Sequence, residues 1–320
     1  MKQDEPNSNI NISNDLLNQI IKSRNLTSLN LQTNLEMLLD EKLFANIDKV
    51  ENRMRIALFE NEPMVIFGHD DPDGITSTYI LYNFLNSCGY QKHCYYIPNR
   101  NLEPHGIQDG FIEFVRQNDY RLIVTVDNGI VSKEGVKNLN AMGCEVIITD
   151  HHIVQPDMLP PAFTIMNPQL PECPYPFKQL AGVGVVLMLI RYLGRLWNHP
   201  VEPASYFWTA VGSIADKVPM IGLNRIIVRY VLEHFAEVQD ETVTFLLRNY
   251  NRINTMSDIF SFLQYTSHLI ANGREPNGQH TAMRFILQLS DAKAKLFEDL
   301  ESQKNKWESE LNRIFKFIDT

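Results

Sequence analysis

Short apolar runs in this chain end directly in clusters of acidic and histidine side chains. Residues 64–68 lead into His69-Asp70-Asp71-Pro72-Asp73-Gly74, residues 122–126 into Asp127-Asn128-Gly129, and residues 145–149 into Asp150-His151-His152. A further run, residues 212–215, leads into Asp216. Short apolar runs that alternate with helical segments are typical of a parallel sheet, whose strand carboxyl ends share one crevice. We therefore expect these side chains to converge on one edge of a sheet.

The whole pattern predicts an α/β fold with a parallel five-stranded sheet flanked by helices, then a mostly helical segment and a long connector helix. Strands are expected at residues 64–68, 93–97, 122–126, 146–149 and 163–166. Helices are expected at residues 75–85, 112–117, 131–142 and 182–197, and the region 207–235 is mostly helical in pattern. Residues 281–318 are expected to form one charged helix or a pair of helices.

Three parts of the chain are distinguished by these patterns. We expect residues 1–60 to form an N-terminal helical arm, residues 61–235 the α/β domain, and residues 236–320 a helical extension with a Gly-Arg loop and the connector helix. Within the arm, the helical pattern spans residues 16–58 and includes the stripe Leu35, Leu38, Leu39 and Leu43. The first 14 residues are rich in Asn, Ser, Asp and Glu and are expected to be a loose arm.

Composition narrows the class of protein. The chain has 320 residues, of which 44% are hydrophobic and 21% charged, as in ordinary globular proteins. Its net charge of -9 argues against a general polyanion-binding surface, although two divalent cations would offset about four charges. The N-terminus is polar, the apolar runs are too short to span a bilayer, and the four cysteines show no CxxC spacing. The sequence therefore predicts a cytoplasmic protein without membrane association.

The side chains in the clusters are those of a hard-metal site. Carboxylates with an imidazole suit Mn²⁺ or Mg²⁺, whereas thiolates would indicate Zn²⁺. On a tight turn, alternate side chains of His69-x-Asp71-x-Asp73 can share one space, and Gly74 lets the chain bend into the next helix. Asp127 is placed to bridge two ions, with His151 and Asp216 completing the second. Two ions about 3.5–4 Å apart would activate water and stabilise the leaving oxygen of a phosphoester.

Simpler interpretations exist for each cluster taken alone. An Asp-x-Asp turn before glycine is more often a loop or a helix cap, and a pair of histidines is more often a surface feature. The combination is different, because four clusters of hard-metal ligands all lie where a predicted strand or helix ends. This combination favours the metal site.

The same segments resemble the four motifs of the DHH phosphoesterase superfamily: residues 69–76, 126–130, 149–152 and 212–219. Within it, the chain is similar to the RecJ family of single-strand-specific 5′→3′ DNA exonucleases, from about residue 16 to the last helix. Stretches outside the four motifs share the similarity, at residues 175–185, 224–230 and Gly273-Arg274.

The resemblance implies a role for each matching residue. It implies that two Mn²⁺ or Mg²⁺ ions are bound, with Asp127 as the bridging ligand and His69 as a further ligand of the first ion; the other ligands are Asp71, Asp73, His151 and Asp216. His152 would contact the scissile phosphate or act as an acid, and Asp150 would orient the histidines. Arg274 would bind substrate phosphate through its planar fork. A salt bridge to Glu275 or to a helix is the alternative role for Arg274.

Two features depart from the family pattern. The family loop Asn-Ala-Ala-Gly-Arg reads Ile270-Ala271-Asn272-Gly273-Arg274 here, so the asparagine has moved. The chain stops at Thr320, inside or just after the connector helix. The resemblance therefore predicts a catalytic core that lacks the family's C-terminal DHH-associated domain.

The resemblance implies a hydrolase that degrades single-stranded DNA from the 5′ end to mononucleotides, by attack of metal-activated water. Its expected partner is single-stranded nucleic acid, DNA rather than RNA, together with replication or repair proteins. Two alternatives remain open. One is a small-substrate DHH hydrolase acting on short oligoribonucleotides or cyclic dinucleotides, and the other is a RecJ-like replication scaffold. Every ligand position is filled by a competent residue, which counts against a scaffold without activity.

Overall fold

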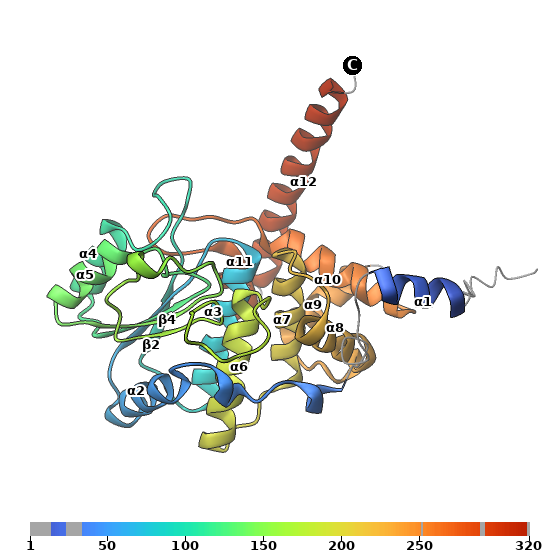
Figure 1. Ribbon diagram of the computed structural model, residues 1–320. Helices are drawn as coiled ribbons and strands as arrows, with labels where there is room; N and C mark the ends of the chain where they lie inside the picture. The colour runs from blue at the N-terminus through green and yellow to red at the C-terminus, as the bar shows by residue number, and fades with distance from the viewer. Residues whose placement is uncertain (1–13, 24–33, 251, 289–291, 319–320) are drawn as a thin grey trace, which may run out of the picture.

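A five-stranded parallel sheet forms the centre of the molecule. The computed structural model describes residues 14–23, 34–250, 252–288 and 292–318, and its overall arrangement is shown in Figure 1. All neighbouring strands run parallel, in the order β2-β1-β3-β4-β5. The strands are β1 Met64–Phe67, β2 His93–Tyr96, β3 Leu122–Val126, β4 Glu145–Thr149 and β5 Thr164–Met166. The predicted fold class is confirmed.

Helices cover both faces of the sheet (Figure 1). Successive strand residues point to opposite faces, so Val65 and Ile123 pack with α4 (Asp109–Gln117) and α5 (Lys133–Ala141). Ile66 and its neighbours pack on the other face, in a larger core that holds α2 (Ile47–Glu60), α3 (Pro72–Ser87) and α6 (Gly182–Trp197). Because both faces are buried, the strands are continuous apolar runs, which is why the sequence predicts them well.

A helical layer continues from α3 and α6. Helix α7 (Pro203–Ala215) packs against both of them, and α8 (Gly222–Glu233) and α10 (Met256–Ile270) pack against α7. The remaining elements are η4 Pro156–Met158, η5 Phe235–Glu237, α9 Glu241–Arg248, α11 Thr281–Leu287 and α12 Ala292–Ile318. Helix α12 projects away from the body of the molecule (Figure 1). The predicted helical segment and long connector helix are thus present.

Helix α3 begins earlier than predicted. We expected a turn at residues 69–74 and a helix from residue 75, but the helix starts at Pro72. Asp71 is its N-cap and accepts a hydrogen bond from the Gly74 N–H at 3.0 Å, while Pro72 takes the first helical position. Proline suits that position because its φ is already helical and no N–H is needed there. Asp73 therefore lies in the first turn of a helix, not in a preceding turn.

The N-terminal region is less continuously helical than predicted. Helix α1 spans Asn14–Ser23, but the leucine stripe at residues 35–43 lies on two three-residue 3-10 turns, η2 Leu35–Met37 and η3 Glu41–Leu43. The side chains of Asn34 and Asp40 cap these turns, because they accept hydrogen bonds from the backbone two residues later. Residues 1–13, predicted to be a loose arm, and residues 24–33 lie outside the described part of the chain.

None of the described helices is long and apolar enough to cross a lipid bilayer.

Candidate metal centre

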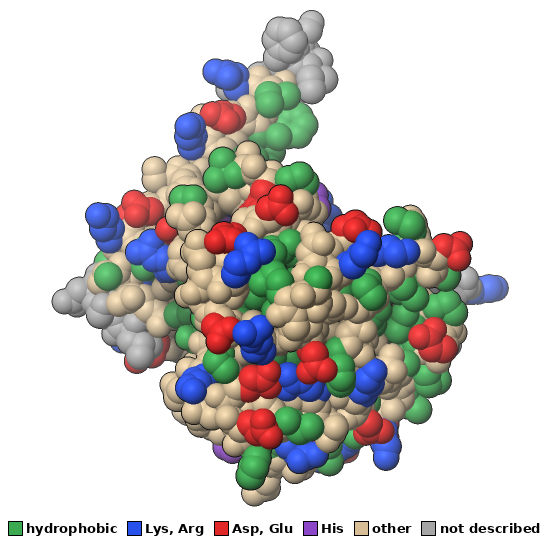
Figure 2. Space-filling view, turned by 90° about the vertical axis from the view of Figure 1, so that its left-hand side faces the viewer, with side chains coloured by type: hydrophobic (Ala, Val, Ile, Leu, Met, Phe, Trp, Pro, Cys, Tyr) green, Lys and Arg blue, Asp and Glu red, His purple; other side chains and the backbone are tan. Residues whose placement is uncertain are grey.

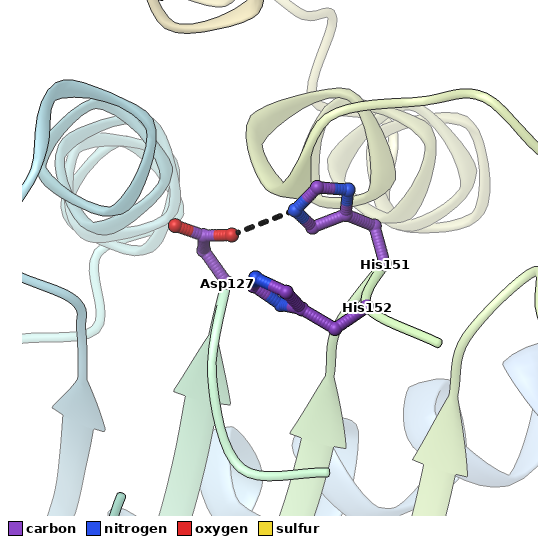
Figure 3. Close-up of side chains that lie close together, drawn as sticks. All are labelled: Asp127, His151 and His152. Atoms are coloured by element: carbon purple, nitrogen blue, oxygen red, sulfur yellow. Dashed lines mark ion pairs between the residues drawn. The ribbon is translucent and has the colours of Figure 1, made fainter. Parts of the chain in front are cut away.

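The predicted ligands meet at the carboxyl edge of the sheet. His69 and Asp71 follow β1, Asp127 follows β3, and His151 follows β4; Figure 3 shows Asp127, His151 and His152 just beyond the strand ends. Asp73 reaches the same edge from the first turn of α3, and Asp216 from the C-cap of α7. Six predicted ligands, drawn from four separate segments of the chain, are thus brought together.

Asp127 lies between two histidines. Its Oδ1 atom is 3.2 Å from His151 Nε2, the pair joined by the dashed line in Figure 3, and its Oδ2 atom is 3.9 Å from His69 Nδ1. His69 Nδ1 also lies 2.8 Å from Asp71 Oδ2. The two oxygens of Asp127 therefore face different histidines, and its predicted bridging role stays a prediction.

Candidate ligand atoms fall into overlapping sets. One set contains His69, Asp71 and Asp127, and its ligand atoms lie within 4.8 Å of one another. A second set contains Asp73, His151 and Asp216; His151 Nε2 is 3.8 Å from Asp73 Oδ2 and 3.8 Å from Asp216 Oδ2. A third set joins Asp127 and His151 to His152. Asp127 belongs to the first and third sets, and His151 to the second and third, so the three sets adjoin one another.

The backbone at Asp127 is held in an uncommon conformation. Asp127 has a φ of 54°, in the left-handed region that few residues other than glycine adopt, and Gly129 follows with a φ of 110°. The Thr125 hydroxyl donates a 2.7 Å hydrogen bond to the Asn128 carbonyl, which closes the turn. This geometry aims the Asp127 carboxylate across the strand ends toward α6.

The N-terminus of α6 is built around two carboxylates. The backbone N–H groups of Gly182 and Val183 donate to the oxygens of Asp73 at 2.7 and 2.8 Å. A β-carbon added at Gly182 would lie 2.4 Å from Asp127 Oδ1, so only glycine allows this approach. The positive end of the helix dipole therefore faces the acidic cluster and offsets part of its charge.

Burial and mutual repulsion raise the pKa values of two aspartates in the cluster. Burial, together with the charges of Asp216 and Asp71, raises the pKa of Asp73 to about 6, despite the opposing effect of His151. Burial, then Asp73 and Asp71, raises the pKa of Asp127 well above its usual range. Packing several carboxylates at one buried edge is unfavourable unless a cation is close.

The donor atoms fit a divalent cation. Asp127 Oδ1 and His151 Nε2 are buried and face each other at 3.2 Å, and neither has a hydrogen-bond partner elsewhere among the described residues. A buried polar atom without a partner costs free energy, and a metal ion bound by both atoms would remove that cost. The residues at this edge therefore fit a metal on physical grounds.

Asp150 forms hydrogen bonds with the two histidines and belongs to none of the three sets of candidate ligand atoms. Its Oδ1 atom accepts from the backbone N–H groups of His151 and His152 at 2.7 and 3.1 Å, and lies 2.7 Å from His152 Nδ1. Its Oδ2 atom accepts from Ile130 N–H at 3.0 Å. The hydrogen bond to Asp150 raises the pKa of His152 to about 8. These contacts fit the predicted orienting role of Asp150.

Arg274 is anchored beside the cluster. Its Nε atom donates to Asp70 Oδ2 at 2.7 Å, and an Nη atom donates to the Asp70 carbonyl at 3.1 Å. The alternative role, a salt bridge to Glu275 or to a helix, differs in its partner: Arg274 pairs with Asp70 and also donates to the carbonyl of Ala271, the C-cap of α10, at 3.4 Å, while Glu275 pairs with Arg284. The predicted phosphate contact of Arg274 stays a prediction.

Sequence reasoning missed two residues near the cluster. Arg100 Nε lies 2.9 Å from Asp70 Oδ1, so two arginines share the buried carboxylate of Asp70. His105 Nδ1 lies 3.2 Å from His69 Nε2. Both residues lie on the loop after β2. The sequence could have indicated them, because both follow a predicted strand, as the acidic and histidine clusters do.

The fold and the acidic edge define a known class of domain. Residues 63–210 match the model of the DHH family, N-terminal domain. This part of the chain is therefore a DHH domain.

Relatives extend the likeness beyond that domain. The chain is 38% identical over 183 residues to the single-stranded-DNA-specific exonuclease RecJ of Bacillus subtilis (strain 168), covering 57% of this chain and 22% of the relative. It is 34% identical over 225 residues to the RecJ of Dickeya dadantii (strain 3937), covering 67% of this chain and 39% of the relative. The resemblance to RecJ is confirmed, and the chain spans well under half the length of either relative.

Solved structures show the same fold. A crystal structure of RecJ in complex with Mn²⁺ from Thermus thermophilus matches with a TM-score of 0.72 at 22% identity, covering 92% of this chain and 42% of that one. A crystal structure of exonuclease RecJ bound to manganese matches with a TM-score of 0.71 at 23% identity, covering 85% and 69% of the two chains.

Proposed function

We propose that this chain carries the catalytic core of a two-metal phosphodiesterase that degrades single-stranded DNA from the 5′ end to mononucleotides. The observation that carries the proposal is the position of Asp127, whose two oxygens face two histidines and whose Oδ1 atom is buried without a hydrogen-bond partner among the described residues. The likeness to RecJ exonucleases supports the choice of single-stranded DNA as substrate. Such an enzyme would act in the cytoplasm, in DNA repair or recombination.

The proposed ligands divide between two ions. His69, Asp71 and Asp127 would hold the first ion, and Asp127 would share the second with Asp73, His151 and Asp216. Carboxylates with imidazoles suit Mn²⁺ or Mg²⁺, and the matched RecJ structures contain manganese. When bound, such a pair of ions supplies a nucleophilic hydroxide at neutral pH and neutralises charge on the phosphoester.

His152 is proposed to handle the substrate phosphate. Its Nδ1 atom is engaged by Asp150, so its Nε2 atom is the one left for the substrate. The hydrogen bond from the ring to Asp150 raises the pKa of His152, which favours the protonated form. A protonated imidazole can hold a phosphate oxygen or donate a proton to the leaving oxygen.

The arginine pair is proposed to hold a second phosphate oxygen. Arg100 and Arg274 share the single carboxylate of Asp70, which leaves one net positive charge beside the metal edge. Guanidinium groups match phosphate geometry through their planar fork. In this proposal residues 61–235 are the catalytic domain, and the extension 236–320 contributes Arg274 to it.

The test is a cleavage assay with purified chain, Mn²⁺ and single-stranded DNA labelled at either end. We expect 5′-labelled DNA to release labelled mononucleotide first, and 3′-labelled DNA to give a shortening ladder. Asp127→Asn should lower the rate by more than about 100-fold, because loss of even a group that orients a ligand costs 10–100-fold. Asp157→Asn, an exposed acid outside the cluster, is the matched control and should match the parent chain.

Other outcomes would contradict the proposal. Cleavage confined to short oligoribonucleotides would indicate a small-substrate hydrolase. Prompt release of labelled mononucleotide from 3′-labelled DNA would show that degradation starts at the 3′ end. Absence of cleavage by a chain with two bound Mn²⁺ ions would indicate either that this core does not suffice for activity or that it serves as a scaffold.

A further inference from the structure

We propose that His105 is a positioning residue for the metal centre, and that it accepts a hydrogen bond from His69 Nε2 when the ring proton, which Nδ1 otherwise donates to Asp71 at 2.8 Å, moves to Nε2 so that Nδ1 can bind a metal. This inference rests on the proposed function, because it assumes that His69 is a ligand. No other part of the predicted site involves His105, which lies on the loop between β2 and α4.

The two rings meet edge to edge. His69 Nε2 lies 3.2 Å from His105 Nδ1. The ring centroids are 5.3 Å apart and the ring planes differ by 22°, which suits an N–H···N hydrogen bond between nearly coplanar rings. The opposite nitrogen of His69, Nδ1, faces Asp71 and Asp127. His69 therefore has one nitrogen toward the acidic edge and the other toward His105.

Metal binding fixes the direction of this hydrogen bond. A nitrogen that binds a metal must offer its lone pair, so His69 Nδ1 carries no proton in the bound state. The ring proton is then on Nε2, which becomes the donor. His105 Nδ1 must accept it, so His105 carries its own proton on Nε2. Metal-binding histidines usually donate their second N–H to a partner that fixes ring orientation, and here that partner is a second imidazole.

The loop that carries His105 is fixed at several points. Arg100 N–H donates to Asp70 Oδ2 at 3.1 Å, and Ile107 N–H donates to the Ser132 hydroxyl at 3.1 Å. The Gln108 side chain donates to the His105 carbonyl at 2.8 Å. An exposed side chain on such a loop can act as a fixed acceptor, because the backbone beneath it is already ordered.

The test compares two nearly isosteric replacements. His105→Asn keeps an acceptor close to the position of Nδ1, whereas His105→Leu has the same branching and no acceptor. Mn²⁺ binding to metal-free protein is measured by titration calorimetry, without substrate. We expect His105→Leu to weaken one of two Mn²⁺ sites by 10–100-fold, and His105→Asn to restore most of that affinity. Thermal unfolding of the metal-free variants checks that the fold is unchanged.

A double mutant tests whether His105 affects Mn²⁺ binding through His69 or through a general change in the site. His69→Ala should lose the same site, and adding His105→Leu to His69→Ala should weaken binding no further, because both changes remove one interaction. In Mg²⁺-saturated protein, long-range ¹H–¹⁵N spectra should place the proton of His69 on Nε2.

Two results would overturn the inference. If the parent chain binds two Mn²⁺ ions and His105→Leu binds them equally well, the proposed metal centre stands and the role of His105 does not. A proton on His69 Nδ1 in the Mg²⁺-bound protein would likewise contradict the proposed role of His105. If the parent chain binds fewer than two Mn²⁺ ions at this edge, the proposed function fails and the inference fails with it.

Discussion

Asp127 combines several features that each destabilise a folded chain. Its side chain is buried, its φ of 54° is uncommon for a residue other than glycine, and one of its oxygens has no hydrogen-bond partner among the described residues. Its pKa is raised by burial and by neighbouring acids. Such features persist when the surrounding structure enforces them, and they mark sites of chemistry more often than sites of stability.

His280 gives a prediction for the pH dependence of stability. It is the N-cap of α11 and accepts a hydrogen bond from Ala282 N–H at 3.2 Å. Burial, followed by the charge of Arg274, lowers its pKa to about 3. The unfolded chain takes up this proton near pH 6.5, so between pH 6.5 and 3 the unfolded state binds one proton more than the folded state. Stability from this group is therefore present above pH 6.5 and is lost as the pH falls.

His280→Asn tests this prediction. Asparagine is also a good N-cap acceptor but does not titrate. Between pH 6 and pH 4, the free energy of unfolding of the parent chain should fall faster than that of the variant, by up to about 1.4 kcal/mol per pH unit. Urea unfolding of metal-free protein at several pH values across this range measures the difference. Parallel pH curves for the two proteins would contradict the buried neutral state of His280.

At the scale of elements, the start of α6 links helix packing to the metal centre. Gly182→Ala places a methyl group at the Asp127 carboxylate, where a β-carbon would be 2.4 Å from Oδ1. Alanine itself does not weaken a helix, since it is favoured over glycine by about 1 kcal/mol in helix interiors. We therefore expect Mn²⁺ affinity to fall by at least about tenfold, the size of a disturbed ligand contact. The unfolding midpoint should fall as well, because a β-carbon this close to a buried side chain forces packed groups to shift.

The matched control for this prediction is Gly110→Ala in α4. A β-carbon there would meet its nearest neighbours at 3.4 and 3.5 Å, which is ordinary contact. Calorimetric titration with Mn²⁺ and a thermal melt are needed for both variants. Equal Mn²⁺ affinity in Gly182→Ala and Gly110→Ala would show that the Asp127 carboxylate does not depend on the approach of α6.

The sequence predicts elements well where burial alone sets the pattern. The strands are apolar on both faces, so their positions are clear from the sequence. The start of α3 was misplaced because Asp71 and Pro72 serve as its N-cap and first residue, yet also belong to the ligand motif. The stripe at residues 35–43 was misread because capped 3-10 turns, and not an α-helix, carry its leucines.

The predicted ligands were recognisable because each follows a strand or ends a helix. Arg100 and His105 also follow a strand, but they were not predicted, since the loop after β2 has no acidic cluster. Their importance depends on Asp70 and His69, which they contact across the sheet edge. The contact between Arg274 and Asp70 joins residues 204 positions apart, and no local pattern encodes it.

At the scale of the whole molecule, negative charge is concentrated where the strands end. On the side shown in Figure 2, Lys and Arg side chains are interspersed with Asp and Glu, so that face offers no continuous basic surface for a nucleic acid. The net charge of -9 agrees with this view. In the proposed function, substrate phosphates are therefore attracted by bound cations and by the arginine pair at Asp70, and not by a broad basic face.

Anomalous diffraction from crystals grown with Mn²⁺ tests the shared position of Asp127 most directly. We predict two anomalous peaks about 3.5–4 Å apart at the carboxyl edge of the sheet, the spacing of two-metal phosphoesterase centres. One peak should contact His69 and Asp71, the other His151 and Asp216, with an Asp127 oxygen on each. A single peak, or two peaks that Asp127 does not join, would contradict the bridging role on which the proposed function depends.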